Sequence, residues 1–181
     1  LGYLYQGPPF RFGYHGLGEP LCWLAFGPFA YSAVLIALNP SNIYFEDIPL
    51  KVSLLLGSGP SLATTLVLFC SHFHQIIEDK KHGKNSPLVR LGAKKGSQFV
   101  PWIIFTIYIF QLFTIVNGFI PVFCILYLIS FPKAIRLINL LRSSYNKPSA
   151  IKNCKFIAIK FQTLNGVGLI IGLIFNYLIN K

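Results

Sequence analysis

The stretch FVPWIIFTIYIFQLFTIV, residues 99–116, decides the fold class, because it carries no charge and is rich in Ile and Phe. An uncharged hydrophobic run of about 18 residues or more is long enough to cross the hydrocarbon core of a bilayer as a helix. Other apolar runs precede and follow it along the chain. We therefore predict an all-α, polytopic membrane helix bundle with five spans. The spans are expected at residues 21–38, 50–79, 99–116, 119–131 and 157–179.

The composition of the whole chain also points to a membrane protein. Hydrophobic residues make up 54% of the 181 residues and charged residues only 12%, whereas ordinary globular domains carry roughly 25% charged residues. The net charge of +11 would by itself suggest nucleic acid as a partner. However, the basic residues lie mainly in two loops between long apolar runs, which a membrane surface explains better. We therefore expect a lipid bilayer as partner and no binding of nucleic acid.

The distribution of Lys and Arg predicts how the bundle is oriented. Three segments and the start of the last span hold 14 of the 16 Lys and Arg residues: 1–20, 72–98, 132–156 and Lys160. Loops rich in Lys and Arg stay on the cytoplasmic side of a membrane. We expect these segments on the cytoplasmic or stromal side and residues 39–49 as a short polar connection between the first two spans.

Residues 132–142 allow two interpretations. Pro132 can open a helix, and Lys133, Arg136 and Arg142 alternate there with apolar residues. This pattern suits an amphipathic helix that lies on the membrane surface. Alternatively, the fourth span simply continues past Pro132.

The most polar segment, residues 72–98, carries the candidate chemistry. If the preceding helix continues through Asp79, then His72, Gln75 and Asp79 share one face of it at spacings of three and four. Glu78 lies beside them. Two carboxylates at the C-terminal end of a helix oppose its dipole, and a divalent cation would relieve that strain.

Basic residues follow these carboxylates along the chain. Lys84 and Arg90 come just after Gly83 and could hold an anion beside the cation. Mg²⁺ is typically held by one or two carboxylates plus phosphate oxygens, so the pattern suits a magnesium diphosphate. The alternative is a solvated loop whose charges only follow the positive-inside rule. His72 and His74 point apart on a helix, and we do not expect them to share a metal ion.

Two parts of the sequence resemble a known family. FCSHFHQ at 69–75, with GK at 83–84 and SPLVRLG at 86–92, is similar to the plant and cyanobacterial naphthoate phytyltransferases around the second acidic motif of UbiA-type prenyltransferases. YQGPPFR at 5–11 with GYHGLGE at 13–19 is similar to the loop before the fifth helix of that family. The resemblance covers the whole chain.

The resemblance implies a domain organisation. Residues 1–181 would form the C-terminal part of a single membrane prenyltransferase domain, with about five of its nine transmembrane helices. The N-terminal helices and the first acidic motif, which complete the active site, would lie upstream of Leu1. We therefore expect this chain to be inactive by itself.

The resemblance also implies roles for individual residues. The second acidic motif is typically D-x-x-x-D, and here Gln75 stands at its first Asp while Asp79 matches its second. The residues expected to bind the metal are Asp79, Glu78 and Gln75. Those expected to bind the diphosphate are Lys84, Arg90 and Asn85, and those expected to bind the acceptor are Arg11, His15 and Glu19. Catalysis is expected to depend on Asp79, Lys84 and Arg90.

The function that the resemblance implies is prenyl transfer with Mg²⁺ as cofactor. A phytyl or other prenyl chain would move from its diphosphate to 1,4-dihydroxy-2-naphthoate with loss of carbon dioxide, in phylloquinone or menaquinone biosynthesis in a plastid or cyanobacterial membrane. One alternative is a membrane transporter for an anionic substrate, which should show an internal repeat, and the sequence shows none. A non-catalytic membrane subunit is a third interpretation. The two long family motifs favour the enzyme.

Overall fold

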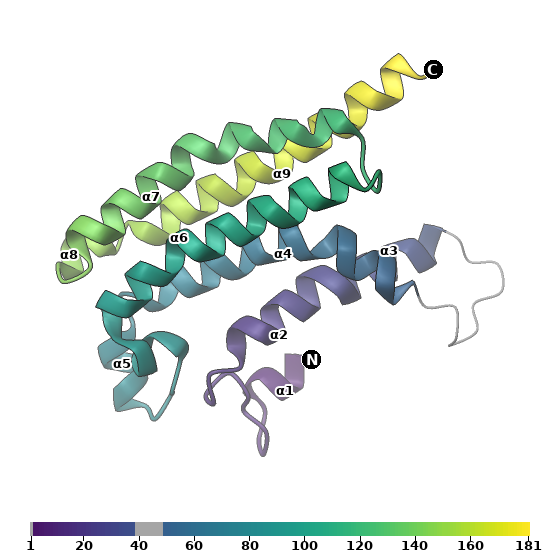
Figure 1. Cartoon of the computed structure of the whole chain (residues 1–181). Helices are drawn as coiled ribbons and strands as arrows, with labels where there is room; N and C mark the ends of the chain where they lie inside the picture. Colours follow the sequence, from purple (N-terminus) through teal and green to yellow (C-terminus); the bar gives the residue numbers. More distant parts are fainter. Residues whose placement is uncertain (1, 39–48) are drawn as a thin grey trace.

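The computed structural model describes residues 2–38 and 49–181, and every regular element in these two ranges is helical. Five helices are long and apolar enough to cross a membrane, and they lie side by side as an all-α bundle (Figure 1). The predicted fold class is therefore confirmed. The five membrane-length helices are Gly18–Leu38, Leu50–His72, Pro87–Val116, Val122–Ser144 and Ser149–Ile179.

Several of these helices are composite. The first consists of α2 (Gly18–Leu24), a π-helical turn (Ala25–Phe29) and α3 (Ala30–Leu38). The second is α4 (Leu50–His72) and the third is α6 (Pro87–Val116). The fourth joins a 3-10 segment (Val122–Ser130) to α7 (Phe131–Ser144), and the fifth is α9 (Cys154–Ile179) preceded by α8 (Pro148–Ile151). Two short helices, α1 (Gly2–Gln6) and α5 (Ile76–Lys81), lie outside the spans.

The predicted boundaries need three corrections. The second span ends at His72 and does not continue to residue 79, and the third begins at Pro87, well before residue 99. The fourth span does not stop at residue 131, because Phe131 has helical dihedral angles and α7 follows directly. The helix thus continues without a break past Pro132, as the second interpretation of residues 132–142 expects. The predicted connection at 39–49 lies almost entirely outside the described residues.

Close contacts at two glycines hold the first two spans together. A Cβ atom on Gly57 of α4 would lie 2.9 Å from the carbonyl carbon of Gly27 in the π-helical turn, and one on Gly27 would lie 2.9 Å from Cβ of Ser61. Small residues allow this close approach between membrane helices, where van der Waals packing replaces the hydrophobic drive. Pro28, inside the π-helical turn, is buried there, as neighbouring helices permit.

Glycines also allow α9 to pack closely against the 3-10 segment. A Cβ atom on Gly168 would lie 2.6 Å from the carbonyl carbon of Leu126 and 2.8 Å from Cα of Tyr127. Gly172, four residues later, approaches the backbone around Cys124 equally closely. The spacing Gly-x-x-x-Gly puts both glycines on one helix face. This stripe therefore sets the position of the fourth span against the fifth.

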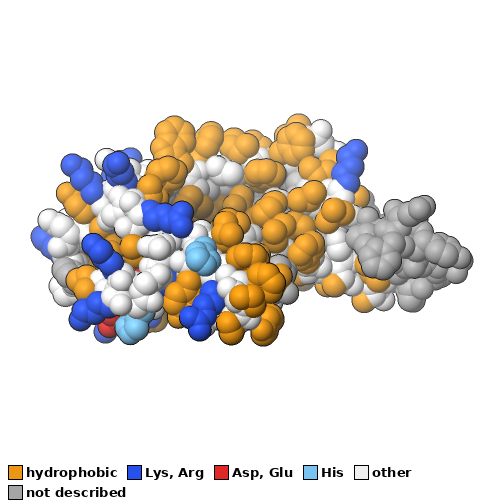
Figure 2. All heavy atoms as spheres, turned by 90° about the horizontal axis from the view of Figure 1, so that it is seen from below, with side chains coloured by type: hydrophobic (Ala, Val, Ile, Leu, Met, Phe, Trp, Pro, Cys, Tyr) orange, Lys and Arg blue, Asp and Glu red, His pale blue; other side chains and the backbone are white. Residues whose placement is uncertain are grey.

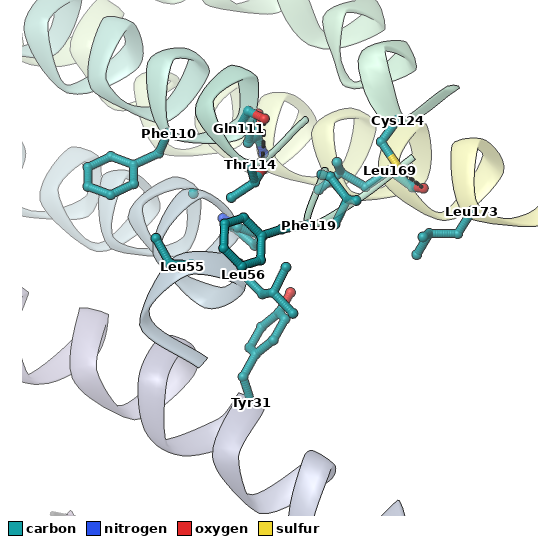
Figure 3. A pocket seen from close by; sticks show the side chains of 13 residues that line it. Tyr31, Leu55, Leu56, Phe110, Gln111, Thr114, Phe119, Cys124, Leu169 and Leu173 are labelled. Atoms are coloured by element: carbon teal, nitrogen blue, oxygen red, sulfur yellow. Dashed lines mark hydrogen bonds between the residues drawn. The ribbon is translucent and has the colours of Figure 1, made fainter. Parts of the chain in front are cut away.

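Polar side chains of α4, α6 and α9 pair with one another inside the bundle. Gln111 of α6 and Asn165 of α9 exchange two hydrogen bonds of 2.6 and 3.0 Å, and Gln162 donates to Thr64 of α4 over 2.9 Å. Because no water is present at this depth to compensate an unmade hydrogen bond, such pairing is required. An apolar cavity of about 280 Å³ lies beside Gln111, between α3, α4, α6 and α9 (Figure 3).

The charges gather at one end of the molecule. Figure 2 shows most Lys and Arg side chains at the end that carries α5 and α8, and hydrophobic side chains over the middle. Figure 1 places α5 and α8 at that same end. The basic segments 72–98 and 132–156 thus share one end of the bundle, as their charge predicts. Which compartment this end faces stays a prediction.

The glycine contact between α9 and the 3-10 segment can be tested with a matched pair of variants. We expect Gly168→Ala to lower the stability of the detergent-solubilised full-length protein by about 1–3 kcal/mol, because its methyl group meets backbone atoms that cannot yield without separating the helices. Gly166→Ala is the control, since nothing lies within 4 Å of its added methyl group. It should be neutral or stabilising through helix propensity. Thermal unfolding measures both, and equal stabilities would contradict the packing.

Candidate functional site

A buried polar network joins the start of α2 to the end of α4 and to the segment that follows α4. Nδ1 of His72 lies 3.0 Å from Oε1 of Glu19, and Nε2 of the same ring lies 3.3 Å from Nζ of Lys84. Nζ of Lys84 lies 3.4 Å from Oδ1 of Asp79. The side chains of Glu19, His72 and Asp79 are nearly inaccessible to solvent. The two sequence parts that resemble the same family therefore meet in one site.

The local fold explains why Lys84 returns to Asp79. The helix α5 ends in a glycine turn in which Gly83 has a φ of 70°, a conformation that glycine adopts without strain. The N–H of Lys84 donates to the carbonyl of Asp79 over 2.8 Å, and that of Gly83 donates to the carbonyl of Lys80 over 3.3 Å. This pair of bonds is the Schellman pattern that ends many helices. It folds Lys84 back over the helix that carries Asp79.

The structure corrects the expected arrangement of the acidic residues. Because α4 ends at His72, the face shared by His72, Gln75 and Asp79 does not form, and Gln75 instead precedes the first residue of α5. Glu78 and Asp79 lie in the first turn of α5, where the helix dipole favours carboxylates. The prediction that the two carboxylates oppose the dipole at a helix C-terminus is therefore wrong. Asp79 is buried, whereas Glu78 is exposed.

A second set of hydrogen bonds connects the N-terminal loop to the residues that follow Lys84. The backbone N–H of Asn85 donates to the carbonyl of Tyr14 over 2.8 Å, and Nη2 of Arg90 donates to the carbonyl of His15 over 2.7 Å. Gly16 has a φ of 77°, and a Cβ atom there would lie 2.8 Å from the carbonyl oxygen of Asn85. The glycine is thus required both by its dihedral angle and by the closeness of the two loops.

The end of this motif also depends on a glycine. Gly92 interrupts α6 with φ of 75° and ψ of 160°, a region that essentially only glycine adopts. The short helical turn Pro87–Leu91, which carries Arg90, is thereby set at an angle to the rest of α6. The side chain of Arg90 is exposed at the rim of the site.

Several acceptor atoms in this region are buried without a partner among the described residues: Oε2 of Glu19, Oδ2 of Asp79 and Oγ of Ser86. An unpaired buried carboxylate oxygen is costly and marks a place for a cation or a donor. Asp79 thus offers one free oxygen to a metal ion. No group of three or more His, Cys, Asp or Glu that could hold a metal occurs in the described part of the chain. Asp79 could therefore bind Mg²⁺ only if phosphate oxygens, water or further residues complete the coordination shell of the ion.

An apolar cavity adjoins the network. It has a volume of about 380 Å³ and is lined by residues of α1, the first span and α4, with Tyr5 in its wall. Burial raises the pKa of Tyr5, and the negative charges of Glu19 and Asp79 raise it further. The phenol therefore keeps its proton and can donate it in a hydrogen bond at neutral pH. Sequence reasoning missed Tyr5, although it opens the matched stretch at 5–11.

The two histidines of the segment face different neighbours. His72 lies between Glu19 and Lys84. His74 instead experiences the positive charges of Lys152 and Lys155. Burial lowers the pKa of His74, and these two lysines lower it further. His72 was not among the expected site residues, because its role depends on a contact 53 residues away in the chain.

The fold and the site together define a class: an all-α membrane bundle with a buried network of carboxylates and a lysine, placed beside an apolar cavity at its basic end. Comparison with known proteins narrows the class. The chain is 39% identical over 167 residues to the 2-carboxy-1,4-naphthoquinone phytyltransferase of the cyanobacterium Synechocystis sp., a match that covers 92% of this chain and 52% of that protein. It is 38% identical over 175 residues to the chloroplastic 2-carboxy-1,4-naphthoquinone phytyltransferase of Arabidopsis thaliana, covering 96% of this chain and 46% of that protein.

The predicted resemblance is therefore confirmed: the chain is a homologue of the naphthoquinone phytyltransferases, which are UbiA-type prenyltransferases. The chain spans about half the length of the curated relatives it matches. No family model and no solved structure matches the chain.

The structure brings some of the expected site residues together and leaves others apart. Glu19, Asp79 and Lys84 share the buried network, and the contacts of Asn85 and Arg90 place His15 at its rim. Three residues have no place in the network: Arg11, Gln75 and Glu78. Arg11 is exposed over the ring of Tyr14. The chemical roles of all these residues stay predictions.

The closeness of the two loops can be tested through Gly16. Both Gly16→Ala and Gly83→Ala place a side chain in the left-handed region, at roughly 1–2 kcal/mol each. Only Gly16→Ala also pushes a methyl group against Asn85 and Arg90, since nothing lies within 4 Å at Gly83. We expect limited trypsin digestion of the full-length protein to cleave after Arg11 several times faster in Gly16→Ala than in Gly83→Ala. Equal rates would show that the loops are not docked.

Proposed function

We propose that this chain is part of a membrane enzyme that transfers a prenyl chain, best represented by phytyl, from its diphosphate to 1,4-dihydroxy-2-naphthoate with loss of carbon dioxide. The observation that carries the proposal is the buried Asp79–Lys84 pair, with its free carboxylate oxygen, beside an apolar cavity. An anion with an apolar tail needs this combination. The names of the two relatives supply the substrate class.

The chemistry of the acceptor follows from the same names. A 2-carboxy-1,4-naphthoquinone is electron-poor, and its two-electron reduced form is 1,4-dihydroxy-2-naphthoate, whose ring is electron-rich. Only the reduced form can attack an allylic cation. The new carbon–carbon bond forms at the ring carbon that bears the carboxylate. The C–O bond of the prenyl diphosphate breaks and its electron pair leaves with diphosphate. The carboxylate then leaves as carbon dioxide, and its electron pair restores the aromatic ring.

The main task of the protein is to stabilise the departing diphosphate. Lys84 has three N–H donors, of which two face His72 and Asp79, and the third has no partner among the described residues. Arg90 keeps guanidinium donors at the rim beyond its bond to His15. Fixed cations aimed at a leaving group act strongly in a site from which water is excluded. Asp79 would hold a Mg²⁺ ion, which would supply positive charge to stabilise the departing diphosphate.

The remaining expected residues have assignable tasks. Asn85 follows Lys84 in the chain and is exposed, so its side-chain amide is free to contact phosphate oxygens. Arg11 and His15 are exposed on the adjoining loop and are suited to the carboxylate of the acceptor. Glu19 has one oxygen engaged by His72 and one without a partner. The cavity wall at Tyr5 is suited to the first apolar units of the prenyl chain.

The proposed location follows from the fold and from the plant relative. Five apolar helices place the protein in a membrane, and the Arabidopsis relative is chloroplastic. We propose a plastid or cyanobacterial membrane, with the basic end on the stromal or cytoplasmic side, and a place in phylloquinone or menaquinone biosynthesis. The alternative of a transporter for an anionic substrate gains no support from the two relatives.

The difference in burial between the two neighbouring carboxylates gives a direct test. Asp79→Ala in the full-length enzyme should reduce magnesium-dependent prenyl transfer by roughly a hundred-fold or more, because several kcal/mol of leaving-group stabilisation are lost. Glu78→Ala is the matched control and should change turnover little, since its side chain is exposed. Product formation in isolated membranes measures both, with the amount of inserted protein as reference. Near-normal turnover of Asp79→Ala would place the metal elsewhere.

The neutral residue at the first motif position allows a second test. Gln75 can reach a metal only through its amide oxygen or a water and adds no charge. We expect Gln75→Asp to tighten magnesium binding to the full-length enzyme in the absence of prenyl diphosphate. The gain should be smaller once a diphosphate analogue is bound, because the added charge repels that anion. Magnesium titrations of both proteins, with and without the analogue, measure this. Identical curves in both conditions would remove Gln75 from the site.

A further inference from the structure

The contact chain Glu19–His72–Lys84–Asp79 contains more than an ion pair. It connects α2 through the end of α4 to the loop after α5, with distances of 3.0, 3.3 and 3.4 Å. The side chain of His72, only 4% exposed, stands in the middle of it. The proposed function assigns no task to this histidine or to its contact with Glu19.

The chemistry of Lys84 determines the tautomer of His72. An ammonium group has only donors, so the ring nitrogen that faces it, Nε2, must present its lone pair. The ring proton then resides on Nδ1 and is donated to Oε1 of Glu19. Glu19 thus fixes the tautomer, and the tautomer gives Lys84 an acceptor that is held by burial in one place.

The contact between His72 and Lys84 is not needed to close the loop. The backbone of Lys84 is already tied to Asp79 by a hydrogen bond of 2.8 Å. The link between α2 and α4 is already made by Glu19 and Nδ1 of His72. The contact with Nε2 instead fixes the position of the ammonium group of Lys84. Without it, the flexible side chain would sample many rotamers.

We infer that Glu19 and His72 are positioning residues that hold Lys84 for the diphosphate of the prenyl donor. Glu19 orients the imidazole, the imidazole and Asp79 each accept one N–H of Lys84, and the third N–H is kept for a phosphate oxygen. Preorganising a charged donor in this way strengthens binding without a new contact to the ligand. The inference rests on the proposed function for the identity of the donor, but on the network alone for the binding of diphosphate.

Two substitutions of His72 separate positioning from a merely structural role. The amide of Asn reaches the place of Nδ1, whereas the longer Gln reaches the place of Nε2. His72→Asn should keep the contact with Glu19 and lose the acceptor for Lys84, and His72→Gln should keep that acceptor. We expect His72→Asn to weaken the binding of inorganic diphosphate with magnesium by about ten-fold, and His72→Gln to bind within about two-fold of wild type.

The measurements use the full-length enzyme in detergent. Calorimetric titration gives the Kd for inorganic diphosphate with magnesium, steady-state assays give KM for prenyl diphosphate and for the naphthoate, and thermal unfolding reports folding. The KM for prenyl diphosphate should rise in His72→Asn while that for the naphthoate stays unchanged. In a Lys84→Met background, His72→Asn should have no further effect on the Kd, because the group that it positions is gone.

The outcomes are distinct. Equal losses in the Asn and Gln variants, unchanged binding in both, or additive losses on top of Lys84→Met would each overturn the inference, because His72 would then act without Lys84. If wild type binds diphosphate in the expected His72-dependent way but does not prenylate the naphthoate, the inference stands and the proposed function fails. If wild type prenylates the naphthoate and the two His72 variants behave alike, the function stands and the inference fails.

Discussion

The hydrogen bond between Glu19 and His72 is the interaction on which the rest of the site depends. A carboxylate and an imidazole are both costly to bury unless they are paired, and here the contact of 3.0 Å offsets part of that cost for each. The pair fastens the start of the first span to the end of the second. The glycine turn at Gly83, a local feature of the end of α5, then returns Lys84 to Asp79 beside this pair.

The apolar spans could be predicted from the sequence because insertion of a helix into a bilayer depends mainly on its length and hydrophobic composition. Their ends could not be predicted, because tertiary contacts decide them. No Gly or Pro marks the end of α4 at His72; the side chain of that residue is held by Glu19 and Lys84 instead. Pro132 looked like a boundary, yet it lies in the first turn of α7, where proline fits a helix.

The candidate site divides in the same way. Asp79, Lys84 and Glu19 stand in stretches that resemble one family, and the structure does place them together. What the sequence could not reveal is which carboxylate points inward, since Glu78 and Asp79 are neighbours and only the start of α5 decides between them. Tyr5 was overlooked, and the contact of His72 with Glu19 was not predicted, for a related reason: the partners of both residues lie far away in the chain.

The balance of formal charges in the network explains why a neutral Gln75 is compatible with the proposed chemistry. Glu19 and Asp79 bring two negative charges, Lys84 brings one positive charge, and His72 is neutral in the tautomer that its contacts require. The sum is one negative charge, which favours the binding of a divalent cation. With that cation bound, the network would carry one positive charge, which favours a diphosphate. A further Asp at position 75 would bring the occupied network to neutrality and remove that attraction. In the proposed metal-loaded site, the amide thus leaves a net positive charge, which favours a multiply charged anion as the leaving group.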